Sequence, residues 1–309
     1  MKLPRLEHSP TPGLMSRLSR RRPSATPGAG ASGFATSTLQ EAVWQRSRTA
    51  SRRWGFWGAA AGALAALVAF APASWLASWV GQAASERLLL TDAAGSLWAG
   101  SAVVVLTGGA GSRDASALPG RLHWQLAPTW GGLRLKARHA CCLNGEQTMH
   151  LRVGLNDWRL ELPAQTSAVG QWPASWLVGL GTPWNTLQLA GSLRLSSAGM
   201  TLQSVQGRMQ LSGGIDLDLL GAGSRMSTLD PLGSYRLSLR GKPTSGEAAT
   251  IVLTTLEGAL RLSGEGQWGG AKLRFRGEAR AAEGQETSLA NLLNIIGRRQ
   301  GAVSVISIG

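Results

Sequence analysis

The dominant pattern in the chain is an alternation of apolar and polar residues that begins near Leu88 and continues almost to the end. Strict alternation puts one set of side chains on each face of a β-strand. The connecting residues are mainly Gly, Pro, Ser and Asn, which tolerate turns. The pattern predicts twelve short strands, at residues 103–106, 121–126, 132–138, 149–153, 158–162, 192–196, 208–212, 215–219, 235–240, 251–255, 259–263 and 272–276.

The short connections predict antiparallel pairing of successive strands, because a hairpin needs few residues and a parallel crossover needs about a dozen or more. We therefore expect a mainly β domain built as a long, curved antiparallel meander. One face should carry Leu, Val and Phe, and the other should carry Arg, Ser, Gln and Asp.

Helical signals are sparse in this part of the chain. Residues 172–177 could form a short helix, and a final apolar strand is expected at residues 303–308. Near the C-terminus, Ser288 is the expected N-cap of a second short helix and Gly297 its expected end. The apolar face of that helix follows the i, i+3, i+4, i+7 spacing and consists of Leu289, Leu292, Leu293 and Ile296.

An uncharged run from Trp54 to Ser85 precedes the strands and predicts a membrane helix. Crossing a hydrocarbon core of about 30 Å takes about 20 apolar residues, which residues 54–73 supply. Trp57 and Trp75 lie about 27 Å apart along a helix. The pairs Trp54 with Trp57 and Trp75 with Trp79 could therefore occupy opposite membrane interfaces. A buried helix of a soluble protein and a cleavable signal peptide are the alternatives, but 53 residues before the run are long for a signal peptide.

Arginines before the run predict its orientation. Arg46, Arg48, Arg52 and Arg53 should remain on the cytoplasmic side under the positive-inside rule. The expected organisation is a cytoplasmic tail at residues 1–53, a transmembrane helix with an interfacial extension at 54–80, and a periplasmic β domain at 81–309. The protein would be a single-pass protein of a bacterial inner membrane.

Two glycines in the apolar run raise the question of helix pairing. Gly58 and Gly62 have the GxxxG spacing that lets membrane helices approach closely. In a segment rich in Ala and Gly this spacing also arises by chance. A contact between two membrane helices and a chance match both remain open.

The net charge is +14, and residues 1–53 supply +8 of it, from ten Lys or Arg less Glu7 and Glu41. Their Pro, Ser, Thr, Ala and Gly content is typical of a disordered tail. A basic segment beside a membrane helix is attracted to anionic lipid headgroups, so we expect these headgroups, and no nucleic acid, as its partner. The GxGxxG match at Gly28, Gly30 and Gly33 lies outside any βαβ unit and is rejected as a nucleotide site.

The adjacent cysteines Cys141 and Cys142 offer two interpretations. They could be small structural residues near a turn, which we favour, or they could form a vicinal or intermolecular disulfide in an oxidising compartment. Together with His139 and His150 they supply nitrogen and sulfur ligands. However, the spacing is not one that zinc sites commonly use, so no metal and no cofactor is expected.

Asp216 and Asp218 share one strand face about 7 Å apart, which suggests a carboxylate pair for acid–base chemistry. A solvated strand face is the favoured interpretation, because acid–base work also needs a pKa shifted by burial. No nucleophile elbow, phosphate loop or zinc-protease motif is present, so an enzyme is not expected. The tryptophans after the run could line a ligand groove, but packing in cores and at sheet edges is favoured for Trp98, Trp124, Trp130, Trp158, Trp172, Trp176, Trp184 and Trp268.

Four segments resemble the type II secretion system protein N family. They are residues 88–102 around Gly-Ser-Leu-Trp-Ala-Gly, residues 232–241, residues 256–268 and the terminal Leu292-Leu-Asn-Ile-Ile-Gly-Arg-Arg. The first is similar to the family pattern A-x-G-T-x-W-x-G, with Ser96 in place of Thr. Together they extend from the apolar run to the end of the chain, while residues 1–53 show no such resemblance.

The resemblance implies a non-enzymatic inner-membrane component of the machine that exports folded proteins across the outer membrane. It implies other subunits of that system as partners. The family also resembles the AsmA-like proteins, whose sheets bend into an apolar groove. The alternative function is therefore binding or transfer of lipid in a groove on the apolar face of the sheet.

Overall fold

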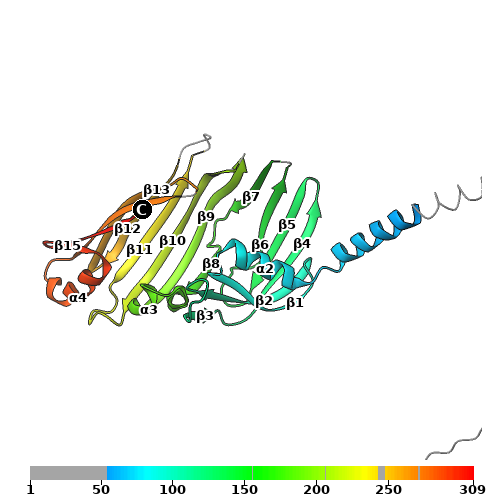
Figure 1. Cartoon of the computed structure of the whole chain (residues 1–309). Coiled ribbons are helices and arrows are strands. Elements are labelled where there is room, and N and C mark those ends of the chain that lie inside the picture. The colour runs from blue at the N-terminus through cyan, green and yellow to red at the C-terminus, as the bar shows by residue number, and fades with distance from the viewer. Residues whose placement is uncertain (1–53, 155, 206, 243–247, 271) are drawn as a thin grey trace, which may run out of the picture. The chain divides into compact units, whose positions relative to one another are not determined.

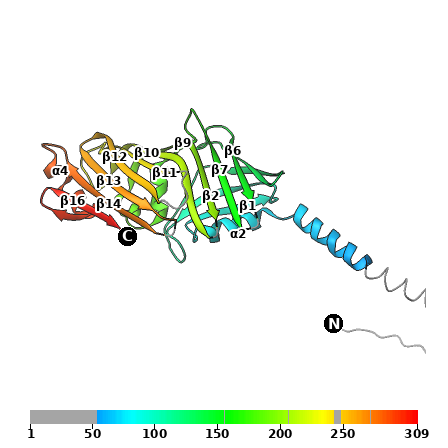
Figure 2. The same cartoon turned by 90° about the horizontal axis from the view of Figure 1, so that it is seen from above.

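The alternating segments form one sixteen-stranded sheet, in which every pair of neighbouring strands is antiparallel. A computed structural model describes residues 54–309 except 155, 206, 243–247 and 271 (Figure 1). The chain divides into a unit Met1–Leu64 and a unit Ala65–Gly309, and the sheet lies wholly in the second. Figures 1 and 2 show a curved, twisted sheet, so the predicted mainly β meander is confirmed.

The strands follow one another across the sheet almost in chain order, β1-β2-β4-β5-β6-β7-β9-β10-β11-β12-β13-β14-β16-β15. Strands β3 and β8 lie off this path, and they pair with β2 and β9 respectively. The strands are β1 Leu88–Gly95, β2 Ala99–Thr107, β3 Ala115–Ala117, β4 Leu122–Thr129, β5 Gly132–His139, β6 Gln147–Val153, β7 Asp157–Ala164, β8 Gly170–Pro173, β9 Leu189–Val205, β10 Arg208–Ser224, β11 Gly233–Gly241, β12 Ala249–Gly258, β13 Leu260–Trp268, β14 Leu273–Ala281, β15 Arg298–Gln300 and β16 Val303–Ile308.

The register of the strands gives the sheet an apolar and a polar face, as the alternation predicts. One line of directly paired residues across five strands, here called the leucine row, consists of Leu133, Leu151, Leu160, Leu202 and Leu211. The next line is polar and consists of Arg134, His150, Glu161, Thr201 and Ser212. Directly paired residues share a face of the sheet, so the two lines project to opposite sides.

Strand β10 corrects the sequence-based segmentation, which placed separate strands at residues 208–212 and 215–219. Both belong to one strand of 17 residues. The intervening Gly213 has φ +84° and lies at a β-bulge against β9, where the register shifts between Gly213 and Ile215. A bulge absorbs one extra residue and bends the strand without ending it, so a glycine that looked like a turn lies within a continuous strand.

Helix α4, Glu286–Ile296, covers the apolar face at the C-terminal end of the sheet. The predicted helix is confirmed, and its residues Leu289, Leu292 and Leu293 are at most 1% exposed. Its start differs from the prediction, because Gln285 and not Ser288 occupies the N-cap position and makes no side-chain capping bond.

The apolar interior of the described residues falls into three clusters. The first joins α4 to β11, β13 and β14. The second joins Ala73 and Leu76 to Trp124 on β4. The third includes Val104, Cys142 and the side chains of Trp172 and Trp176. Residues 172–177, predicted as a short helix, lie partly in β8 and partly in a 3-10 helix, η1 Ala174–Leu180, which precedes a single short turn, α3 Trp184–Leu187.

The uncharged run forms two helices rather than one. Residues 54–69 are helical, and α2 follows at Ala73–Ala83. Pro72 stands between them as the N-cap of α2, and a proline disfavours helical geometry in the residue before it. The break lies against the β domain, since Ala71 is buried and its carbonyl accepts a hydrogen bond at 2.8 Å from the amide of Leu97, between β1 and β2. Among the described residues, no helix is both long enough and apolar enough to cross a membrane.

Candidate functional site

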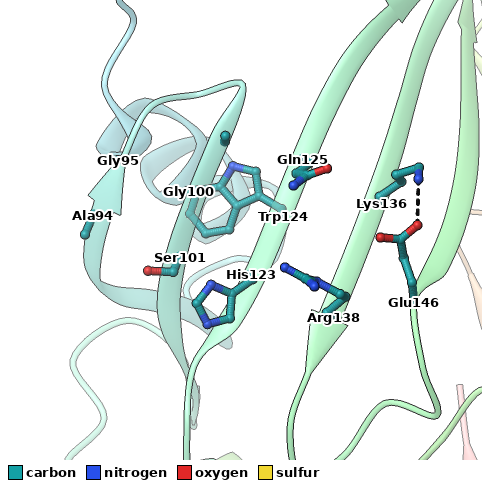
Figure 3. A pocket seen from close by; sticks show the side chains of 11 residues that line it. Ala94, Gly95, Gly100, Ser101, His123, Trp124, Gln125, Lys136, Arg138 and Glu146 are labelled. Carbon is teal, nitrogen blue, oxygen red and sulfur yellow. Dashed lines mark hydrogen bonds and ion pairs between the residues drawn. The ribbon is translucent and has the colours of Figure 1, made fainter.

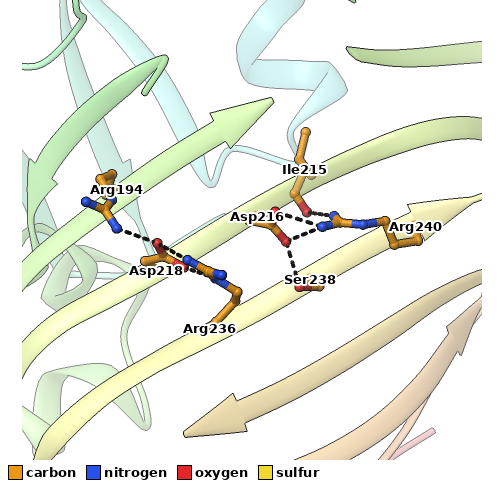
Figure 4. A network of polar contacts seen from close by, with 7 residues as sticks. All are labelled: Arg194, Ile215, Asp216, Asp218, Arg236, Ser238 and Arg240. Carbon is orange, nitrogen blue, oxygen red and sulfur yellow. Dashed lines mark hydrogen bonds and ion pairs between the residues drawn. The ribbon is translucent and has the colours of Figure 1, made fainter. Parts of the chain in front are cut away.

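The most developed polar cluster lies on the polar face of β9, β10 and β11 (Figure 4). Asp218, 1% exposed, accepts hydrogen bonds from Arg236 at 2.7 and 3.0 Å and from Arg194 at 2.9 Å. The arginines come from the two strands that flank β10, at the positions directly paired with Asp218. This carboxylate therefore joins three strands through its two oxygens.

Asp216, two residues earlier on the same face, makes a second set of contacts. Arg240 donates to both of its carboxylate oxygens at 2.7 Å, and the Ser238 hydroxyl donates at 2.6 Å. The two aspartates thus bind different arginines, although Figure 4 shows them side by side. The prediction of a solvated strand face is wrong for Asp218, because the arginines above it exclude water from the carboxylate.

The electrostatics of the cluster favour ionised carboxylates. The hydrogen bond from Arg236 lowers the pKa of Asp218, against the opposing effect of burial, and Arg194 lowers it further. For Asp216, burial acts to raise the pKa, but hydrogen bonds from Arg240 and Ser238 outweigh burial and lower the pKa. A general acid needs a raised pKa. This pair has the opposite shift, and its arrangement is that of a structural ion cluster.

A surface pocket of about 350 Å³ opens on β1, β2, β4 and β5 (Figure 3). Glycine forms part of its wall: a Cβ atom on Gly100 would lie 2.5 Å from the ring of Trp124, and one on Gly95 would lie 2.6 Å from the Ala99 carbonyl oxygen. The strands and the buried indole can come this close only because these two residues have no side chain.

The polar lining of the pocket is mainly basic. His123 and Arg138 are directly paired on β4 and β5, and both are exposed. Lys136 lies two residues from Arg138 and donates to Glu146 at 2.7 Å. Figure 3 shows these side chains around one opening. Lys136 and Arg138 carry two positive charges and Glu146 carries one negative charge, so the opening has a net positive charge. Such an opening is complementary to an acidic group of a partner. Nothing in the alternation pattern singles out these residues, because the alternation does not show which residues of β4 and β5 lie directly opposite one another.

The turn after β5 brings the two cysteines together with a histidine. Cys141 and Cys142 form a disulfide, the alternative that we favoured less. The ligand atoms of His139, Cys141 and Cys142 all lie within 4.8 Å of one another, whereas His150 is outside this group. His139 is 4% exposed, and neither of its ring nitrogens has a hydrogen-bond partner among the described residues. Burial and the neighbouring His123 lower the pKa of His139, which keeps the imidazole neutral.

The tryptophans proposed for the membrane interfaces are exposed. Trp54 and Trp57 are 79% and 70% exposed, and Trp75 and Trp79 are 50% and 65% exposed. Trp75 and Trp79 are spaced i, i+4 on α2, on the side opposite Ala73, which is buried in the second cluster. A Cβ atom on Gly58 or Gly62 would meet nothing within 4 Å. Arg46, Arg48, Arg52, Arg53 and the glycine motif at residues 28–33 lie outside the described residues.

The tryptophans of the β domain mostly pack, as predicted. Trp124 is 3% exposed in the second cluster, where its indole nitrogen donates to the Leu97 carbonyl at 3.1 Å. Trp172 and Trp176 pack in the third cluster. Trp130 departs from the prediction, because it stands fully exposed at the turn between β4 and β5.

The leucine row is a part of the apolar face that lies outside all three clusters. Leu211 is 6% exposed, and the other four members are half-buried. The apolar face continues onto β11, where Leu237 is 39% exposed. A partly open apolar strip therefore crosses the middle of the sheet between the second and first clusters.

Comparison with known protein families gives one match. The model of the family described as type II secretion system protein N matches residues 86–306, which is more than half of the 309 residues and reaches from β1 to β16. No curated protein sequence and no solved structure matches the chain.

Proposed function

We propose, because this chain belongs to the type II secretion system protein N family, that it is a non-enzymatic inner-membrane component of the type II secretion system. Its role would be in assembly or protein contacts during export of folded proteins across the outer membrane. The observation that carries the proposal is the family match, which spans nearly the whole sheet. The aspartate cluster is consistent with a structural role, since the lowered pKa of each carboxyl does not suit a general acid and arginines bind the carboxylate oxygens.

The proposed anchor is the apolar run at residues 54–80. Every side chain from residue 54 to residue 70 is exposed, including Phe56 and Phe70 at 71% and 83%. A helix that is apolar on all sides needs an apolar environment, and a lipid bilayer supplies one. The sixteen helical residues rise about 24 Å, so about four further residues would complete a span of about 30 Å.

Helix α2 would lie at the periplasmic interface of the inner membrane. Its buried side holds Ala73 and Gly81 against the sheet, while its exposed side presents Trp75 and Trp79. Indole rings favour the headgroup region because they are apolar with one polar group. The arginines before residue 54 would keep the tail in the cytoplasm, beside anionic headgroups, and the β domain would then lie in the periplasm.

Fusions test this topology directly. A periplasm-active reporter joined after Ser85 should be active, and the same reporter joined within the first 53 residues should be inactive. A matched variant with Arg46, Arg48, Arg52 and Arg53 replaced by Gln should lower the activity of the Ser85 fusion, because the positive-inside signal is lost. Equal activity of the two wild-type fusions would contradict the proposed orientation.

The proposed contact surface for partner subunits is the basic pocket beside Trp124. Arg138→Glu reverses one charge at its opening, and Arg261→Glu makes the same change at an exposed position on β13. In a strain that lacks the chromosomal gene, the wild-type chain should restore secretion of hydrolases, and Arg261→Glu should do the same. Arg138→Glu should reduce secretion and crosslinking to other subunits. Full secretion without the gene would contradict a required role, and equal results for the two variants would contradict this surface.

The second candidate function is lipid binding, which the partly open leucine row favours. An acyl chain on this strip would cover half-buried leucines that belong to none of the apolar clusters. Phospholipid should copurify with the protein and be detected by mass spectrometry, and Leu160→Asp should reduce it. Leu256→Asp, at a position 46% exposed, is the control. Retention of the same lipid by Leu160→Asp would set this function aside.

A further inference from the structure

The turn between β5 and β6 combines two sulfur atoms with a buried, unpartnered imidazole. His139 is the last residue of β5, and the amides of Cys142 and Leu143 donate to its carbonyl oxygen at 3.4 and 3.3 Å. These bonds fold the chain back so that both cysteines lie beside the ring. We propose that the reduced form of this turn binds a thiophilic cation, Zn²⁺ or Cu⁺, through His139, Cys141 and Cys142.

The imidazole supplies the first reason. A buried polar group without a hydrogen bond costs roughly 1–3 kcal/mol, and His139 leaves two such nitrogens at 4% exposure. A cation at this position would occupy one nitrogen. The ligand atoms lie within 4.8 Å of one another, so little of the chain must move to surround one ion.

The ligand set supplies the second reason. Thiolates bind soft cations, and imidazole suits both zinc and copper. With Zn–S near 2.3 Å and Zn–N near 2.0 Å, two sulfurs around one tetrahedral ion lie about 3.7 Å apart. A disulfide offers no thiolate, and Cys141 and Cys142 are joined in one, so the bond must open before the site forms.

Opening the bond is a reduction with a defined balance. A dithiol reductant attacks the exposed Cys141 sulfur as a thiolate, the S–S bond breaks, and Cys142 leaves as a thiolate that takes up a proton. The second thiol of the reductant then displaces Cys141, so the reductant becomes a disulfide and the chain gains two thiols. Cation binding releases one proton from each thiol. Cys141 is exposed and Cys142 is 3% exposed, so the first attack is directed to Cys141.

Cobalt binding to the full-length chain tests the proposal. The protein is reduced with a phosphine and titrated with Co²⁺, and thiolate-to-cobalt charge-transfer absorption is recorded before and after equimolar Zn²⁺. The reduced wild-type chain should bind one Co²⁺ that Zn²⁺ displaces, and the oxidised chain should show no such band. His139→Gln should weaken binding at least about tenfold, since even changes behind a metal ligand cost about 10- to 100-fold.

His150→Gln is the matched control, because His150 lies outside the ligand group, and it should bind as the wild type does. Cys141→Ser changes an exposed residue, so it keeps the test valid if His139→Gln fails to fold. This variant should weaken Co²⁺ binding at least about tenfold. Circular dichroism verifies the sheet in each variant. Absence of the charge-transfer band in the reduced wild type, or equal binding by His139→Gln and His150→Gln, would overturn the proposal.

Discussion

Replacing Asp218 with Asn should destabilise the sheet more than any other single change of charge on its polar face that we consider. The substitution keeps the shape of the side chain and removes its charge. An amide also turns one acceptor into a donor that faces a guanidinium, so at least one of the three hydrogen bonds to Asp218 is lost. The two arginines cannot restore it, because no other carboxylate is paired to them across β10.

The expected loss of unfolding free energy depends on the burial of Asp218 and on the exposure of its two arginines. Removing one partner of a fully buried ion pair costs about 3–5 kcal/mol. Here Asp218 is buried, but the side chains of Arg194 and Arg236 are each 40% exposed and can regain water. We therefore expect a loss of about 2–3 kcal/mol of unfolding free energy, near the value for a hydrogen bond to a charged group.

The effect should depend on pH with a definite sign. The folded pKa of Asp218 is lowered, so its ionisation stabilises the protein at pH values above the unfolded pKa of about 3.9. The contribution is lost as the pH falls through the folded pKa. The difference between wild type and Asp218→Asn should therefore be constant from pH 7 to about pH 5 and shrink at lower pH.

Urea unfolding followed by circular dichroism measures these differences at several pH values. Asp92→Asn is the matched control, because Asp92 is 76% exposed and pairs with Arg121 at the surface, and it should change stability by less than about 0.5 kcal/mol. The reasoning is refuted if Asp218→Asn costs no more than Asp92→Asn, or if its cost is the same at pH 3 and at pH 7.

Three further changes probe the core, the bulge and the proposed membrane contact. Leu292→Ala, at a residue 1% exposed, should cost about 2–5 kcal/mol in urea unfolding, whereas Leu256→Ala, at 46% exposure, should cost less than about 1 kcal/mol; equal costs would contradict the assignment of the first cluster as the core. Gly213→Val places a β-branched residue at φ +84° with its Cβ 2.0 Å from a backbone oxygen of β9. The substitution should therefore lower the unfolding temperature by several degrees, and an unchanged unfolding temperature would exclude the bulge. Replacing both Trp75 and Trp79 with Ser should reduce quenching of tryptophan fluorescence by brominated phospholipids in vesicles that contain the full chain, and undiminished quenching would place α2 away from the lipid.

The sequence was sufficient where the signal is local. Alternation identified the strands and their two faces, because side chains of a strand change sides at every residue. Helical spacing identified Leu289, Leu292 and Leu293 as one face, and all three are in the core. Short connections identified sequential antiparallel pairing, and the quoted segments identified the family that the match over residues 86–306 confirms.

Local signals were not sufficient where partners are distant. Gly213 is a residue type common in turns, but its pairing with β9 and β11 keeps it within one continuous strand. Ser288 is a residue type that favours the N-cap position, but the helix begins at Glu286, before the first residue of its apolar face, Leu289. Pro72 is a local signal for the break between the two helices, but the hydrogen bond from the Leu97 amide to the Ala71 carbonyl just before it depends on the folded β domain.

Only the tertiary structure decided which polar residues share a site. Asp216 and Asp218 have equal places in the alternation, yet two arginines from neighbouring strands bury Asp218 and leave Asp216 22% exposed. The basic pocket joins His123 to Arg138 in the same way. The physical reason is that periodicity assigns a residue to a face, whereas its burial, charge environment and partners depend on the register between neighbouring strands, which the pattern within one strand does not contain.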